Sequence, residues 1–72
     1  MKTIDKIIEV MPKDREFRAM EVAQIVFPKH ERNDTEGRCY NRGVSTTARL
    51  LRRIRGVVEN PHGVFYAHSE YF

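Results

Sequence analysis

The stretch GVSTTARLLRRIRGVVENPHGVFY, residues 43–66, decides the fold. In its first half apolar side chains recur at helical spacing, and in its second half the spacing changes to that of strands. The apolar set of the first half is Val44, Thr47, Ala48, Leu50, Leu51 and Ile54. The opposite face carries Arg49 and Arg53, with Arg52 at its edge. The pattern predicts a helix over residues 44–55 with a buried side and a cationic side.

A β-hairpin is predicted directly after this helix. Residues 57–59 (Val-Val-Glu) and 64–67 (Val-Phe-Tyr-Ala) have the composition of two short strands. Residues 60–63 (Asn-Pro-His-Gly) supply the turn, because Pro fixes one φ and Gly permits a positive φ. Successive strand residues point to opposite faces of a sheet, so we expect Phe65 or Val64 to face the core, and the register stays open.

Two more helices are predicted nearer the N-terminus. The apolar residues at helical spacing are Ile4, Ile7, Ile8 and Met11 in the first set, and Ala19, Val22, Ala23, Val26 and Phe27 in the second. The first set predicts a helix over residues 3–11 that Pro12 ends, and the second a helix over 19–27 that Pro28 ends. Between them, the isolated Phe17 is expected in the core, on a very short strand.

The segment between the second and third helices is polar. Residues 28–42 (PKHERNDTEGRCYNR) lack apolar periodicity and are rich in charge, Asn, Asp and Gly, which predicts a long polar loop. Connections of this length in compact domains are usually functional or mobile. The whole pattern predicts one α+β domain over residues 1–72, with three helices followed by a two-stranded β-hairpin.

Length and composition narrow the class of function. A chain of 72 residues buries a small core and is too short to enclose a deep substrate cleft, so we expect no enzyme. Residues 1–12 carry Asp5 and Glu9 and lack a long apolar run, so neither a signal peptide nor a membrane span is expected. Cys39 is the single cysteine, which excludes an internal disulfide and suits a reduced, cytoplasmic setting.

Positive charge is concentrated in one segment of the chain. The net charge is +3, from 13 basic and 10 acidic side chains. Residues 38–58 hold six Arg and no acidic residue. Arg is suited to two-bond contacts with phosphate and guanine. This one-sided segment favours contact with nucleic acid, while a protein partner or a merely solvated surface remain the alternatives.

The order helix, helix, helix, hairpin, together with residues 43–66, resembles the winged helix-turn-helix family of DNA-binding domains. Members commonly carry Ser or Thr near the start of a recognition helix, a Leu-rich face, and a glycine turn into a strand-turn-strand wing. The resemblance implies base contacts by Ser45, Thr46, Arg49 and Arg53. It implies contacts to the DNA backbone by Arg38, Arg42, Arg52 and, at the wing tip, His62.

The function that this resemblance implies is duplex DNA binding in transcriptional regulation, in the cytoplasm or on the nucleoid. A homodimer or a protein partner would add specificity to so small a footprint. One feature departs from the family, which usually joins its second and third helices by a short turn. The long connection here holds Glu31, Asp34 and Glu36, which oppose phosphate. The alternative is therefore a protein-interaction module, an inhibitor or adaptor of a nucleic-acid enzyme, and RNA binding is a weaker third.

Other chemistry is not indicated. The candidates for zinc ligation are Cys39, His30, His62 and His68, and they lack the paired spacing of a tetrahedral site, so we expect no metal and no cofactor. Nothing in the sequence fixes a nucleophile beside a base. Tyr40 lies between Arg38 and Arg42, where it either contacts nucleic acid or covers the core.

Overall fold

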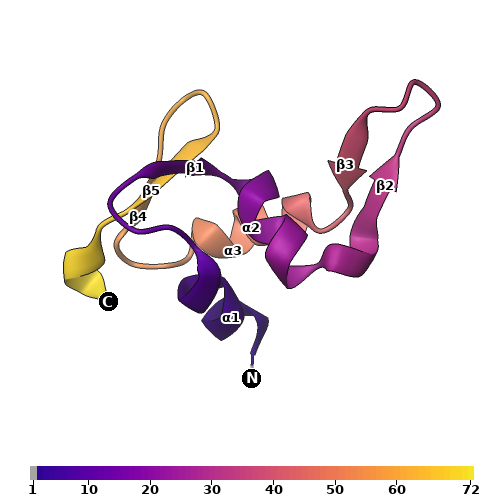
Figure 1. The fold of residues 1–72 in the computed structure, drawn as a ribbon. Coiled ribbons are helices and arrows are strands. Elements are labelled where there is room, and N and C mark those ends of the chain that lie inside the picture. Colours follow the sequence, from indigo (N-terminus) through magenta and orange to yellow (C-terminus); the bar gives the residue numbers. More distant parts are fainter. Residues whose placement is uncertain (1) are drawn as a thin grey trace.

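Three helices pack against a small antiparallel sheet in the computed structural model of the chain, which describes residues 2–72, with the backbone alone at Cys39 (Figure 1). The helices are α1 (Thr3–Val10), α2 (Ala19–Val26) and α3 (Val44–Leu51), with 3₁₀ turns η1 (Pro28–His30) and η2 (Ser69–Tyr71). The strands are β1 (Glu16–Arg18), β2 (Glu31–Asn33), β3 (Cys39–Asn41), β4 (Val57–Glu59) and β5 (Val64–Ala67). The predicted α+β class is confirmed. Within residues 2–72 no helix has the length and apolar character to span a bilayer.

The core lies between the helices and one face of the sheet β1–β5–β4. Phe17 of β1 and Phe65 of β5 are register partners, and their rings stack with centroids 6.0 Å apart. The buried apolar residues around them are Ile7, Met11, Ala19, Val22, Leu51, Ile54 and Ala67. Phe65 therefore faces the core, while Val64 is only half-buried. This settles which of the two residues points inward, a choice that the sequence left open.

Most predicted elements agree with the structure to within one residue. The helices expected over 3–11 and 19–27 are α1 and α2, and the strands expected over 57–59 and 64–67 are β4 and β5. The strand expected around Phe17 is β1. These elements carry periodic apolar residues, so burial of one face determines where they form.

The third helix ends earlier than predicted. The expectation of a helix over 44–55 is wrong at its C-terminal end, because α3 stops at Leu51 and the chain continues in tight turns. The Arg53 amide donates to the Leu50 carbonyl at 3.0 Å, and the Ile54 amide to the Leu51 carbonyl at 3.2 Å. Such bonds over three residues keep Ile54 buried without another α-helical turn.

Residues 28–42 do not form the irregular loop that the sequence predicted. Instead, η1 leads into an antiparallel hairpin of β2 and β3, which projects away from the helices (Figure 1). Every residue of β2 is exposed, so the hairpin has no apolar alternation that the sequence could have displayed. Its order comes from the ladder between the strands and from the turn at residues 34–37, which contains Gly37 at φ +80°.

Thr47, on the inner side of α3, is fully buried, and its hydroxyl finds no hydrogen-bond partner within residues 2–72. An unpaired buried hydroxyl costs roughly 1–3 kcal/mol. We expect Thr47→Val, which exchanges this hydroxyl for a methyl group, to raise the free energy of unfolding by about 1 kcal/mol. Urea unfolding of the two proteins measures the difference. A destabilised variant would show that the hydroxyl makes a stabilising bond in solution.

Candidate nucleic-acid interface

The outward face of α3 is the candidate interface, and its position depends on how the helix is anchored. Thr47 and Leu51 are fully buried on the inner face, where half-buried apolar neighbours pack against the core. Those neighbours are Val44, Ala48 and Leu50. The side of α3 that faces solvent is therefore fixed by burial of the other side.

Asn41 joins the end of α2 to the start of α3. Its buried side-chain amide donates to the Phe27 carbonyl at 2.9 Å and to the Ala23 carbonyl at 3.3 Å. Its Oδ1 accepts from the Gly43 amide at 2.7 Å. One side chain thus pairs the last carbonyls of α2 and orients the first residue before α3. The burial of Asn41 was not predicted, because an Asn within a polar segment is expected to be exposed.

Gly43 allows α2 and α3 to approach closely. A Cβ at this position would lie 2.4 Å from Cδ2 of Phe27, closer than carbon atoms pack. Phe27 is the residue that follows α2, so the contact sets the distance between the two helices at the point where α3 begins. The glycine before α3 therefore serves packing between helices.

The outward face of α3 carries three of the predicted site residues, and a fourth lies just beyond the helix. Ser45 and Arg49 are exposed on the helix, and Thr46 is half-buried beside them. Arg53 is exposed but lies two residues beyond the end of α3. Arg42, exposed just before the helix, extends the same cationic stretch. No ion pair within the described residues involves Arg42, Arg49 or Arg53, so their charges are uncompensated by a direct acidic contact.

Arg52 is held by an acid of the hairpin β4–β5. Its Nε and one terminal nitrogen donate to the two carboxylate oxygens of Glu59 in β4, at 2.8 and 3.1 Å. The hydrogen bond with Glu59 raises the pKa of Arg52, and the same bond lowers the pKa of Glu59. Arg52 was predicted to contact the DNA backbone, whereas here its charge is compensated within the protein.

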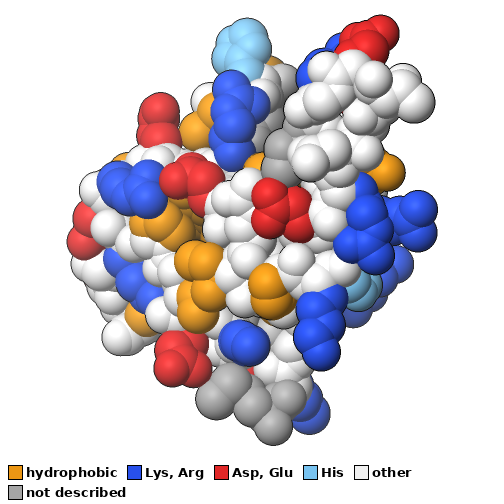
Figure 2. All heavy atoms as spheres, turned by 45° about the vertical axis from the view of Figure 1, so that its right-hand side comes forward, with side chains coloured by type: hydrophobic (Ala, Val, Ile, Leu, Met, Phe, Trp, Pro, Cys, Tyr) orange, Lys and Arg blue, Asp and Glu red, His pale blue; other side chains and the backbone are white. Residues whose placement is uncertain are grey.

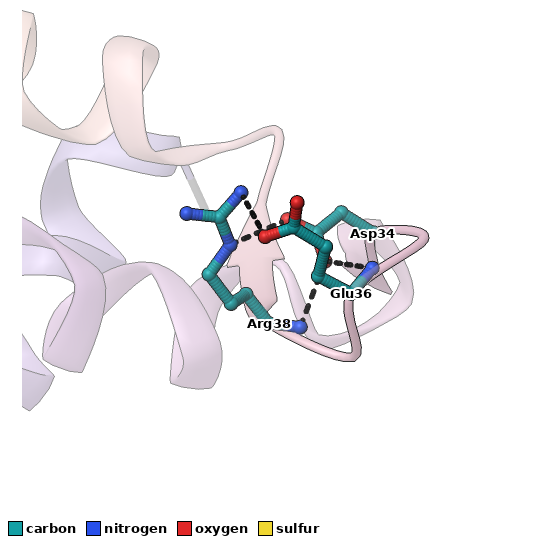
Figure 3. Close-up of polar contacts among 3 residues, drawn as sticks. All are labelled: Asp34, Glu36 and Arg38. Atoms are coloured by element: carbon teal, nitrogen blue, oxygen red, sulfur yellow. Dashed lines mark hydrogen bonds and ion pairs between the residues drawn. The ribbon is translucent and has the colours of Figure 1, made fainter.

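Arg38 is similarly engaged, at the tip of the hairpin β2–β3 (Figure 3). Its Nε lies 2.9 Å from an Asp34 oxygen and a terminal nitrogen 2.9 Å from a Glu36 oxygen. The Arg38 backbone amide also donates to Asp34, which lowers the pKa of that carboxyl. Two of the acids that would oppose phosphate are therefore partly neutralised, and the tip keeps a formal charge of −1.

His62, the last predicted site residue, is exposed in the turn between β4 and β5. Its amide donates to Oδ1 of Asn60 at 2.9 Å, which holds the turn closed. Figure 2 shows Lys and Arg side chains gathered on the face below the projecting hairpin, with acidic side chains at its tip. Exposed cations near the base of the hairpin include Lys29 and Arg32, which the sequence did not single out because they lie outside the Arg-rich segment.

The pair of Arg52 and Glu59 makes stability depend on pH. Because the pKa of Glu59 is lowered in the folded state, ionised Glu59 stabilises the fold above its ordinary pKa, and this contribution is lost as pH falls through the lowered value. We expect Glu59→Gln to melt at a lower temperature than the unchanged protein at about pH 7, with the difference vanishing at about pH 2. Thermal melts followed by circular dichroism test this. A difference that persisted unchanged in acid would contradict it.

No group of three or more His, Cys, Asp or Glu side chains in the described part of the chain is placed to hold a metal ion. The arrangement offers instead a solvent-facing set of guanidinium groups on α3 and at its two ends, which suits binding to an anionic surface. Comparison of the chain with protein-family models, with curated proteins and with solved structures found no match.

Proposed function

We propose that this chain is a winged-helix DNA-binding domain, a transcriptional regulator that binds duplex DNA through the outward face of α3. The order α1–β1–α2–α3–β4–β5, with β4 and β5 as the wing, supports this assignment, although η1 and the hairpin β2–β3 stand between α2 and α3. The observation that carries it is the exposure of Arg49 and Arg53 without an acidic partner, on the side of the helix opposite the fully buried Thr47 and Leu51.

The dimensions of α3 suit the major groove. An α-helix with its side chains is about 10–12 Å in diameter, and the groove is about 12 Å wide. Helices that read DNA usually place their N-terminal residues on base edges, which here are Ser45 and Thr46. Arg49, one turn further on, has the reach for a two-bond contact with guanine, worth about 1–3 kcal/mol of discrimination. Arg53, beyond the last turn, stands at the rim of the groove.

The salt dependence of binding follows from the number of uncompensated cations. Each phosphate contact contributes about −0.9 to the slope of log affinity against log salt. Six free Arg side chains would give roughly −5. Arg38 and Arg52 are held in ion pairs, and the Arg55 guanidinium lies over the Tyr71 ring, which leaves Arg42, Arg49 and Arg53. We therefore expect a slope of roughly −3.

Fluorescence anisotropy with a labelled random-sequence duplex, titrated between about 50 and 200 mM salt, tests the proposal. Binding at low salt with the expected slope supports it. Absence of binding at about 50 mM salt, where non-specific attraction to phosphate is strongest, would overturn it and favour the protein-interaction module. Competition by duplex RNA at equal strength would overturn the preference for DNA.

A further inference from the structure

The hairpin β2–β3 and the wing are built on the same turn. In the wing, Oδ1 of Asn60 accepts from the amides of His62 and Val64 at 2.9 and 3.0 Å. The Asn60 amide donates to the Val64 carbonyl at 2.9 Å, and Gly63 takes φ +77°. This is a tight turn closed by a glycine in the left-handed region.

The tip of β2–β3 repeats each of these features. Oδ1 of Asp34 accepts from the amides of Glu36 and Arg38 at 2.9 and 2.8 Å. The Asp34 amide donates to the Arg38 carbonyl at 2.9 Å, and Gly37 takes φ +80°. The protein therefore carries two rigid hairpins of one design, and in the view of Figure 1 α3 lies between them, with both rising from the side of the molecule away from α1.

One face of the hairpin β2–β3 turns away from the body of the protein. Arg32 and Tyr40 are register partners, so their side chains share a face. Asn41, the next residue, points the other way and is buried against the end of α2. Tyr40 is accordingly 39% exposed, and Arg42, in the turn that follows β3, is exposed as well. Since α3 begins two residues after Arg42, the hairpin lies directly before the helix in the chain.

The charge on this face is positive near the body. The guanidinium of Arg32 donates to the carbonyls of Lys29 and Glu31, both at 2.7 Å. Neutral carbonyls hold the group in place without cancelling its charge. Arg42 and Lys29 add exposed cations, while Arg38 forms ion pairs with Asp34 and Glu36 at the tip.

We propose that the hairpin β2–β3 is a second arm that lies along the phosphate backbone of the duplex held by α3. Arg32 contacts phosphate, and the Tyr40 ring packs on the neighbouring sugar. The inference rests on the proposed DNA binding. It adds that the protein covers a longer stretch of the duplex than the part of the major groove that α3 enters. The molecule is 42 Å in its longest dimension, more than one turn of duplex at about 34 Å, so an arm beyond the groove has backbone to meet.

The variant Arg32→Gln/Tyr40→Ala tests the arm, because it leaves every residue of α3 unchanged. Affinity for a 24-base-pair duplex is measured by anisotropy, and the protected length by hydroxyl-radical footprinting. Loss of one phosphate contact predicts roughly eightfold weaker binding at about 0.1 M salt, a slope smaller by about 0.9, and a footprint shortened on one side. Arg32→Lys keeps the cation and should retain most of the affinity.

The charge-matched control is Lys6→Gln, an exposed cation of α1 on the side opposite the two hairpins (Figure 1). Both substituted residues of the arm are exposed, so circular dichroism is expected to show an unchanged fold for the variant. If the arm variant kept its affinity and footprint while the unaltered protein bound normally, the proposed role of the arm would be wrong. The proposed DNA binding through α3 would then still stand. Failure of the unaltered protein to bind the duplex would overturn DNA binding itself and the arm with it.

Discussion

Replacing Phe65 with alanine is expected to lower the free energy of unfolding by about 3–5 kcal/mol, most of the stability of a domain this small. Phe65 is 2% exposed and stacks on Phe17. It also lies on the central strand, paired with β1 on one side and β4 on the other. Because both neighbouring strands are held by their ladders, the surrounding structure cannot collapse far into the cavity.

The matched control for this substitution is Val58→Ala. Val58 lies on the adjacent strand β4 and is 53% exposed, so its truncation should change the free energy of unfolding by less than about 0.5 kcal/mol. Urea denaturation followed by circular dichroism measures both variants. Equal, small effects at the two positions would mean that the sheet does not form the core described above.

The second large effect is expected on DNA binding. Arg49→Ala/Arg53→Ala removes two uncompensated cations from the outward side of α3, and the counterion-release rule predicts a loss of affinity of tens of fold at about 0.1 M salt. The slope against salt should fall by about 1.8. Any preference among duplex sequences should also weaken, since Arg49 is the residue placed to read guanine. Anisotropy titrations measure all three quantities.

Lys2→Ala/Lys6→Ala removes the same formal charge from the region of α1 and is the control for net charge. If binding depends on the position of the cations, this pair should keep nearly the full affinity. An equal loss in both double variants would reduce the interaction to a general attraction between a basic protein and DNA, and the assigned face would be wrong.

The sequence predicted the elements whose order comes from apolar burial. The spacing of Ile4, Ile7 and Ile8 requires a helix with one buried side, and α1 forms there. The end of α3 was not predictable in this way. Ile54, three positions after Leu51, can be buried either by a further α-helical turn or by the tighter turn that the chain adopts. Ile54 is buried in either case.

The hairpin β2–β3 was missed although a signal for it exists. Residues 34–37 (Asp-Thr-Glu-Gly) match residues 60–63 (Asn-Pro-His-Gly) in the two positions that make the turn, the Asp or Asn at its start and the Gly at its end. The hairpin β4–β5 was predicted because apolar strands flank its turn. The other turn lies between polar strands, for which the rule of alternation gives no indication.

The ion pairs of the candidate site also lay beyond sequence reasoning. Six Arg between residues 38 and 58 look equivalent in a charge count. The fold separates them, because β4 brings Glu59 to Arg52 and the turn brings Asp34 to Arg38. Only tertiary geometry decides which cations remain available to a partner.

The most direct test of the proposed interface is the change in backbone amide chemical shifts when a short duplex is added to labelled protein. Binding through the outward face of α3, with the hairpin β4–β5 beside it, predicts changes at residues 42–53 and 60–64, and the proposed arm adds changes in β2 and β3. The amides of α1 should stay unmoved. Changes confined to α1 or to the C-terminal residues 68–72 would contradict the interface.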